Sequence, residues 1–311
     1  MIKSIRALMA SSAAVATLWL APSAMAQQAA PAPAPVAVPQ AEGQGPAMWV
    51  IRDEDSTLYL FGSFHLLKPT TAWGQAHVDA AFSSADEIWF ELSDMGNEAQ
   101  AMPLIQQLGL SPDRPLSSIM TAEDIAKLDA VAQKLGANAA MFDPMRPWFV
   151  SMQLALVQLM IGGFDPNAGV EKVLMARAAA EGKPIKGFET LREQLELMAG
   201  ISEEGQIAML RASLDDLAET PDQMEKLMNA WATGNVPEIE TALVTEMKAE
   251  QPEAYEALLT RRNANWTRQI KQLLEGSGTA FIAVGAAHLA GPDSVQSMLA
   301  AEGITAERVT H

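Results

Sequence analysis

Two segments of the chain carry the same pattern, in which four apolar residues are followed by G-x-x-H-L-x-x-P. The first segment contains Gly62 and His65, and the second contains Gly285 and His288. Only four of the 311 residues are histidine and 20 are glycine, so the same spacing on two histidines argues against coincidence. An imidazole can bind a metal ion or act as a general acid or base near neutral pH. The repeated pattern therefore predicts a site that uses His65 and His288.

Each of these histidines follows an apolar run that has the composition of a buried strand. We expect Gly62 and Gly285 to let the chain turn sharply where each strand ends, without a side-chain clash. His65 and His288 would then stand at the carboxyl-terminal edge of an α/β sheet, where ligands commonly bind. Two neighbouring strands would bring them together. The plainer alternative is two unrelated histidines, each hydrogen-bonded within a turn.

A carboxylate joins the two imidazoles as a candidate. Glu91 lies within the apolar strand E-I-W-F-E-L, and a buried acid is costly unless it is paired or bound to a metal. With His65 and His288 it would complete an open site for a divalent ion such as Mn, Co or Zn. Glu91 could instead be the general base beside a metal held by other residues. A salt bridge at the end of a strand is the plain alternative.

The pattern of apolar residues predicts an α/β fold with a central mixed sheet. Strands are predicted at 48–52, 57–61, 87–92, 183–188, 279–284 and 304–309, with the first two forming a hairpin. Helices are predicted at 73–85, 121–135, 148–161, 169–181 and 294–302, and the stretch 190–275 is almost entirely helical. The N- and C-terminal strands would therefore meet in one sheet around a large helical insertion.

Composition narrows the possible functions. The chain is 49% hydrophobic and 19% charged, which is typical of a globular protein. Its formal charge of −17 disfavours a nucleic-acid partner. It has no cysteine, which excludes disulfides, thiolate nucleophiles and Fe–S clusters.

The N-terminus has the three parts of an export signal. Lys3 and Arg6 precede an apolar run, and Ala-Met-Ala ends at Ala26. We expect cleavage after Ala26, a periplasmic location and no stable membrane anchor, because the apolar run is short for a bilayer span and no lipid-bearing cysteine follows. Residues 27–46 are rich in Ala, Pro and Gln and are predicted to be a disordered linker. The folded domain would then comprise 47–311.

Other polar residues allow more than one interpretation. Arg262 lies in a predicted helix that is rich in polar residues, and this helix composition favours a solvent-exposed cation. Glu189 begins a helix, where it would suit the helix dipole or orient an imidazole. His77 and His311 are expected to be inert, and Ser63 lacks the G-x-S-x-G context of a serine hydrolase.

The mature chain resembles the TraB/PrgY/GumN family, most closely its GumN-like branch. The residues that carry the resemblance follow one another in the family's order over roughly 47–309. They are Trp49-Val50-Ile51-Arg52, the first G-x-x-H unit, Glu91, Arg146-Pro147-Trp148, Gly169-Val170-Glu171, Glu189-Thr190 with Gln194, Arg262-Asn263 with Trp266, and the second G-x-x-H unit.

The resemblance implies a fold and a site. The family is defined by paired GxxH motifs and a glutamate, includes the metal-dependent TIKI proteases, and is thought to share its fold with erythromycin-esterase-like and ChaN-like proteins. Carried over, the GxxH pairs fall on Gly62 with His65 and Gly285 with His288. The glutamate falls on Glu91, and an Arg-Asn element falls on Arg262 and Asn263.

The leading hypothesis is an exported metal-dependent hydrolase that acts on a peptide or small molecule. His65 and His288, with Glu91 as a third ligand, would bind the divalent ion, and Glu91 would accept the proton if it is not a ligand. Arg262 would clamp the substrate, and Glu189 and Asn263 would orient the ligands without touching the ion. Two alternatives remain open. One is a non-catalytic binder of a peptide, signal or haem, and the other is a metal-free His/Glu hydrolase of the erythromycin-esterase kind.

Overall fold

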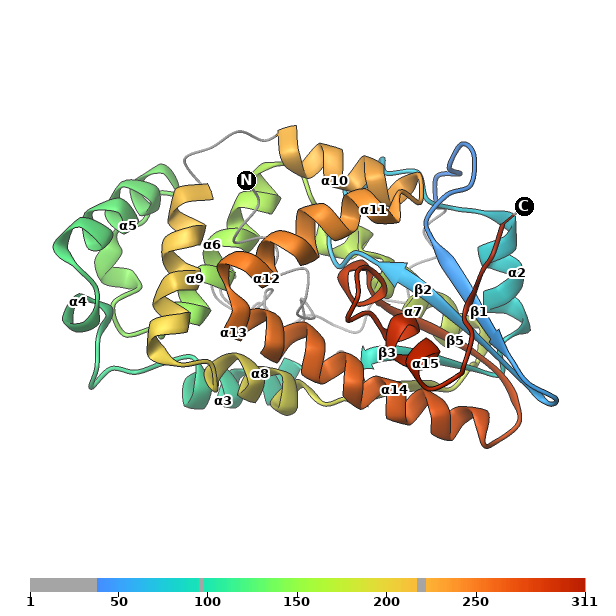
Figure 1. Ribbon diagram of the computed structural model, residues 1–311. Helices are drawn as coiled ribbons and strands as arrows, with labels where there is room; N and C mark the ends of the chain where they lie inside the picture. The colour runs from blue at the N-terminus through green and yellow to red at the C-terminus, as the bar shows by residue number, and fades with distance from the viewer. Residues whose placement is uncertain (1–37, 95–97, 217–221, 311) are drawn as a thin grey trace.

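The computed structural model describes residues 38–94, 98–216 and 222–310 (Figure 1). The predicted signal peptide and the first part of the predicted linker lie outside these residues. The last part of that linker packs on the domain: the amides of Trp73 and Gly74 both donate to the carbonyl of Pro39, at 3.0 and 2.9 Å. Main-chain bonds to the body of the protein therefore begin before residue 47.

A six-stranded mixed sheet lies at one end of the molecule, with the helical majority at the other (Figure 1). Its strand order is β4-β3-β5-β2-β1-β6. The strands are β1 (Met48–Arg52), β2 (Ser56–Ser63), β3 (Glu87–Leu92), β4 (Ile185–Glu189), β5 (Gly278–Gly285) and β6 (Glu307–Arg308). β4, β3, β5 and β2 are parallel, whereas β1 runs antiparallel to both β2 and β6. The predicted mixed sheet of N- and C-terminal strands is confirmed.

β5 lies inside the sheet, and most of its residues are apolar and buried. A parallel strand that helices cover on both faces requires this composition. It pairs with β2 on one side and β3 on the other, with Leu60 opposite Ile282 in the first pair. The strand predicted at 183–188 is present as β4. It lies at the edge of the sheet and is only partly buried.

Helices cover both faces of the sheet. Leu60 and Ile282 pack on one face with Trp266 of α14 and Leu299 of α15, whereas Phe61 and Phe281 pack on the other with α2. This alternation follows from the two-residue repeat of a strand. The bounds are α2 (Ala76–Ser84), α14 (Arg261–Leu274) and α15 (Val295–Ala301).

The remaining helices form the predicted insertion, which β4 divides into two parts. The first part comprises α3 (Glu98–Leu108), α4 (Leu116–Ile119), α5 (Ala122–Lys134), α6 (Pro147–Ile161) and α7 (Val170–Glu181). The second comprises α8 (Leu191–Ala199), α9 (Glu203–Asp216), α10 (Asp222–Ala232), α11 (Val236–Ile239), α12 (Glu246–Glu250) and α13 (Pro252–Tyr255), and it leads into α14. Thr121 and Asp124 form a capping box at the start of α5.

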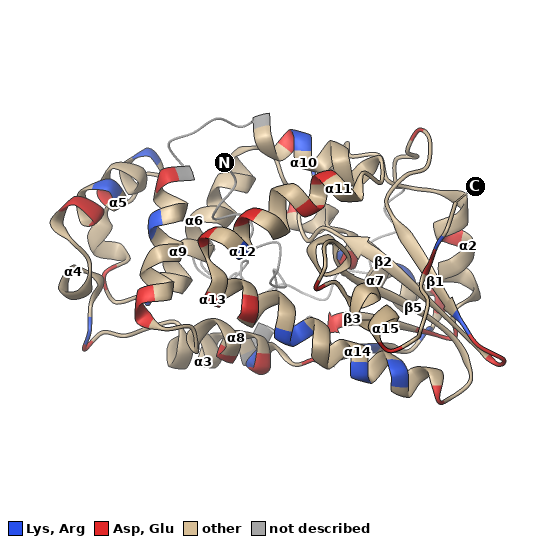
Figure 2. Cartoon of the chain, viewed as in Figure 1, with Lys and Arg blue, Asp and Glu red and all other residues tan. Residues whose placement is uncertain are grey.

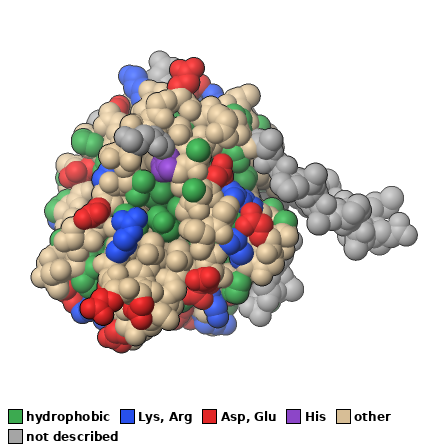
Figure 3. Space-filling model, turned by 90° about the vertical axis from the view of Figure 1, so that its right-hand side faces the viewer, with side chains coloured by type: hydrophobic (Ala, Val, Ile, Leu, Met, Phe, Trp, Pro, Cys, Tyr) green, Lys and Arg blue, Asp and Glu red, His purple; other side chains and the backbone are tan. Residues whose placement is uncertain are grey.

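Charged side chains of both signs are interspersed over the outer helices and over the sheet end of the molecule (Figures 2 and 3). Among the helices of the three described segments, none combines the length and apolar content that crossing a bilayer requires.

Candidate functional site

The four parallel strands end along one edge of the sheet, and the predicted site residues gather there. Glu189 is the last residue of β4, and Glu91 is the next to last of β3. His65 follows β2, and His288 lies in a 3₁₀ turn that follows β5 directly. Because β3, β5 and β2 are neighbours, three chain segments that are distant in sequence deliver their side chains to the same edge.

Glu91 is an ionised carboxylate at the centre of this cluster. It is 1% exposed. Its Oε1 accepts from the amide of Gly285 at 2.7 Å, and its Oε2 accepts from Nη2 of Arg262 at 2.6 Å. Burial raises the pKa of Glu91, but Arg262, both imidazoles and the Gly285 amide outweigh burial and lower it to about 2.

Arg262 is buried, contrary to the solvated cation that its helix composition favours. It is 2% exposed, because the face of α14 that carries Arg262 and Trp266 packs on the sheet. Nε lies 2.9 Å from Oε1 of Glu189, and Nη1 donates to the carbonyl of Leu258 at 3.1 Å. Burial lowers the pKa of Arg262, but Glu189 and Glu91 outweigh burial and raise it, so the guanidinium is a fixed cation between two carboxylates.

The hydrogen-bond partners of His288 place a proton on its Nδ1. Nδ1 lies 2.5 Å from Oδ1 of Asn263, and Nε2 lies 3.1 Å from Nη1 of Arg262. A guanidinium only donates and an amide oxygen only accepts, so these partners assign Nδ1–H and an Nε2 lone pair. The orientation of the Asn263 amide is set in turn, because its Nδ2 donates to the carbonyl of Asp293 at 2.7 Å.

His65 has a carboxylate partner instead of an amide. Its Nδ1 lies 2.9 Å from Oε1 of Glu171, and the hydroxyl of Ser63 donates to the same oxygen. Burial lowers the pKa of His65, but Glu171 outweighs burial and raises it to about 9. Nε2 of His65 is buried and has no hydrogen-bond partner within the described residues.

Sequence reasoning assigned no role to Glu171, although Gly169-Val170-Glu171 is part of the family pattern. A glutamate in the first turn of a helix normally needs no partner beyond the helix dipole. Its burial, at 6% exposure, depends on how α7 docks against the first GxxH turn, which spacing in the sequence does not reveal.

Glu189 supports Arg262 rather than an imidazole. Among the described residues, its carboxylate bonds to Arg262 and to Nε2 of Gln194, the latter at 3.2 Å. Gln194 also reaches Oε2 of Glu91, at 3.5 Å. Burial raises the pKa of Glu189, and Arg262 opposes that rise.

The two glycines serve purposes other than the sharp turn expected of them. Gly62 has strand geometry within β2, and a Cβ added there would lie 3.3 Å from Cα of Ala286, so Gly62 allows the two GxxH turns to approach closely. Gly285 has a φ of −52°, which any residue adopts, and its amide binds Glu91.

The donor set fits a divalent ion in several respects. Nε2 of His288 and Oε1 of Glu91 lie 3.8 Å apart, a separation that one ion can bridge after a small adjustment. Glu91 and Glu189 contact the guanidinium of Arg262, and a third buried carboxylate, Glu171, contacts His65. Within the described part of the chain, however, no three His, Asp or Glu side chains already converge on one cation position.

Of the two remaining histidines, the structure describes His77 alone, and His77 does not join the cluster. His77 is the second residue of α2 and half-buried. His311 lies outside the described residues.

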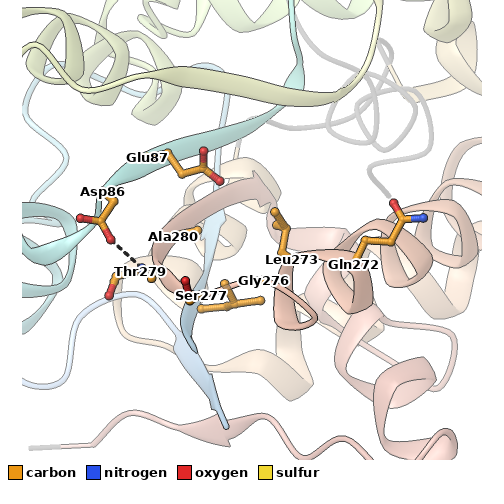
Figure 4. Close-up of a pocket in the computed structure, with 10 residues that line it drawn as sticks. Asp86, Glu87, Gln272, Leu273, Gly276, Ser277, Thr279 and Ala280 are labelled. Atoms are coloured by element: carbon orange, nitrogen blue, oxygen red, sulfur yellow. Dashed lines mark hydrogen bonds between the residues drawn. The ribbon is translucent and has the colours of Figure 1, made fainter. Parts of the chain in front are cut away.

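A separate pocket of about 260 Å³ lies at the opposite edge of the sheet, where β3 and β5 begin (Figure 4). Asp86 and Glu87 line it, and Asp86 accepts from the amide of Thr279 at 2.8 Å. None of the predicted site residues lines this pocket.

Comparison with known proteins identifies the family of the chain. The family model described as "TraB/PrgY/gumN family" matches residues 47–308. The chain belongs to the TraB/PrgY/gumN family. A Treponema pallidum relative, described as an uncharacterized protein, is 24% identical over 263 residues, which cover 79% of this chain and 78% of the relative. The uncharacterized protein YbaP of Escherichia coli is 23% identical over 184 residues, which cover 59% and 67% of the two chains. No solved structure matches the chain.

Proposed function

We propose that this TraB/PrgY/gumN-family protein is a metal-dependent hydrolase whose single divalent ion is held by His65, His288 and Glu91. The observation that carries the proposal is that both imidazoles are tied down through Nδ1. Glu171 holds Nδ1 of His65, and Asn263 holds Nδ1 of His288. Metal-binding histidines are typically oriented in this way, and the ion would bind Nε2 of His65 directly and Nε2 of His288 in exchange for its contact with Arg262.

The charges of the cluster support the same proposal. With both imidazoles neutral, three buried carboxylates and one guanidinium leave a net charge of about −2, which is costly in a buried site. One divalent ion would balance this charge. A proton on His65 balances part of it when no ion is bound, so protons and metal compete for Nε2 of His65.

The residues have separate tasks in hydrolysis. A divalent ion bound there would polarise the carbonyl of the substrate and lower the pKa of a bound water. If the two imidazoles hold the ion without it, Glu91, ionised and fixed by the Gly285 amide, is the group placed to accept a proton. Arg262 holds Glu91 in place, and its Nη1, which lies against Nε2 of His288, would donate to a developing oxyanion once that nitrogen binds the ion.

We propose a peptide as the substrate class, in line with the TIKI proteases that the family resemblance implies, and the periplasm as the location. The bacterial relatives found by comparison are uncharacterized, so the substrate rests on that resemblance and on the carbonyl chemistry of the site.

The proposal is tested with protein that starts at Gln27 and has been stripped of metal. We expect Mn²⁺, Co²⁺ or Zn²⁺ to raise the melting temperature of the wild type, and we expect His65→Ala and His288→Ala to lose most of that rise. His77→Ala is the matched control, because His77 lies outside the cluster and should keep the response. Absence of any metal response in the wild type would overturn the proposal.

A second candidate, metal-free hydrolysis, is favoured by the Glu171–His65 pair. A carboxylate that holds Nδ1 leaves Nε2 to exchange a proton, and with its pKa raised to about 9 His65 would act there as a general acid near neutral pH and as a base in alkaline solution. This candidate predicts turnover of peptides or esters that survives excess chelator, whereas the metal-dependent reaction stops. The third possibility, a binder without turnover, would give ligand affinity in both conditions and hydrolysis in neither.

A further inference from the structure

The start of α7 crosses directly over the first GxxH turn. The amide of Val170 donates to the carbonyl of Phe64 at 3.0 Å, and the amide of Asp165 donates to the carbonyl of Leu67 at 2.9 Å. Residues from the helical insertion are thus bonded through the main chain to both sides of His65. Such bonds fix the position of the helix start far more tightly than side-chain packing alone.

Gly169 makes this close crossing sterically feasible. A Cβ added at Gly169 would lie 2.0 Å from the carbonyl oxygen of His65, a distance at which the backbone has to move. The φ of Gly169 is −59°, so the backbone conformation itself would accept any residue. Close approach to His65 is therefore the requirement that selects glycine here.

The crossing delivers Glu171 to His65. Oε1 of Glu171 accepts from both Ser63 and Nδ1 of His65, and each of these side chains is at least nine-tenths buried. Because Ser63 anchors the carboxylate from a second direction, Glu171 holds one orientation. Nε2 of His65, at the far side of the ring, remains without a partner among the described residues.

The two histidines of the repeated pattern thus have unequal partners. Glu171 offers His65 a charged oxygen, whereas Asn263 offers His288 a neutral amide oxygen. A carboxylate partner makes an imidazole a stronger ligand than an amide partner does. The sequence repeat is therefore chemically asymmetric at the site.

We propose that Gly169 and Glu171 are positioning residues, which fix the proton of His65 on Nδ1 and make His65 the stronger ligand of the pair. The ligand part of this inference rests on the proposed function, whereas the proton part does not. Glu171 acts through His65 and need not touch the substrate.

The first experiment uses metal-free protein and ¹⁵N NMR of the histidine side chains. We expect a protected Nδ1–H of His65 in the wild type, its loss in Glu171→Ala and its rescue in Glu171→Gln, because glutamine keeps an acceptor at Oε1. An unchanged Nδ1–H signal in Glu171→Ala would overturn the proposal, whether or not the protein binds metal.

The second experiment measures Co²⁺ affinity and the Co²⁺ absorption spectrum in alkaline buffer, where protons compete least for His65. Glu171→Gln should weaken binding by about 10- to 100-fold. Gly169→Ala should act in the same direction, because it displaces the helix start without changing any ligand. Glu181→Gln at the solvent-facing end of α7 and Gly276→Ala are matched controls that should bind as the wild type does.

The outcomes separate the two proposals. A wild type that ignores Co²⁺ overturns the metal-dependent function, and the NMR result still decides whether Glu171 positions His65. A wild type that binds Co²⁺, with Glu171→Gln equal to it in affinity and spectrum, overturns the ligand part of this inference alone.

Discussion

Nε2 of His288 and Oε1 of Glu91 lie 3.8 Å apart, although they come from opposite ends of the domain. The Arg262 guanidinium contacts both residues, with Nη2 on Glu91 and Nη1 on His288. This cation therefore keeps the site compact when no other cation is bound.

Removing the guanidinium should destabilise the fold strongly. Arg262→Met leaves Glu91 and Glu189 buried without their cation, which we expect to lower the free energy of unfolding by about 3–5 kcal/mol. Urea denaturation measures the loss. Arg261→Met, in the same turn of α14 but with its side chain 64% exposed, should change stability by less than about 1 kcal/mol. Equal effects of the two variants would contradict the buried network.

The Glu171–His65 pair should make stability depend on pH in the alkaline range. The pKa of His65 is raised from 6.5 to about 9, so the contribution is complete below pH 6.5 and is lost as pH rises through 9. A change of that size corresponds to on the order of 3 kcal/mol in the metal-free protein. The difference in unfolding free energy between the wild type and Glu171→Gln, measured across this range, should shrink at high pH; a constant difference would argue against the pair.

Metal affinity should rise with pH for the same reason. Because the ion must displace a proton from His65, we expect about a tenfold gain in affinity per pH unit up to about pH 9. Competition with a chelator of known affinity measures this slope, with pH effects on the chelator taken into account. A flat profile would show that His65 is not a ligand.

Loss of the Glu91 charge should greatly reduce catalysis, while the glutamine side chain keeps the buried volume filled. The pKa of Glu91 is lowered to about 2, so the residue is ionised throughout the working range, and Glu91→Gln removes a charge that is always present. We expect hydrolysis to fall by about 10²- to 10⁴-fold, measured with a quenched peptide substrate. Glu87→Gln on the same strand is the control and should remain active, since Glu87 bonds to Trp89 outside the cluster.

Export can be checked on the mature protein itself. Expression of the full chain in a bacterial host should give a periplasmic product whose mass begins at Gln27, because cleavage is expected after Ala26. Large side chains at Ala24 and Ala26 should block processing. Recovery from the cytosol of a protein that still begins at Met1 would contradict the predicted export signal.

Sequence patterns predicted the sheet more completely than the site. The run E-I-W-F-E-L predicted β3 with its observed bounds, and the repeated GxxH units predicted that β2 and β5 lie side by side. These predictions succeed because alternation and burial are local properties of a strand. The fit of α7 against His65 is a tertiary contact, so the role of Glu171 left no local pattern to detect.

The burial of Arg262 is a second tertiary feature that no local sequence pattern predicts. In a helix of low hydropathy, an arginine near the first turn has the composition of a solvent-facing residue. Its burial depends on carboxylates contributed by β3 and β4, which no spacing within the helix can reveal. Only the family resemblance indicated it in advance.

The position of β5 between β3 and β2 has a consequence for how the protein is made. Because this middle strand and its histidine are among the last parts to be synthesised, a growing or partly threaded polypeptide lacks half of the cluster. If the chain leaves the cytoplasm unfolded, the precursor holds no complete site during export. Its reactive centre would assemble only after delivery, which makes the order of the strands a safeguard that requires no separate inhibitor.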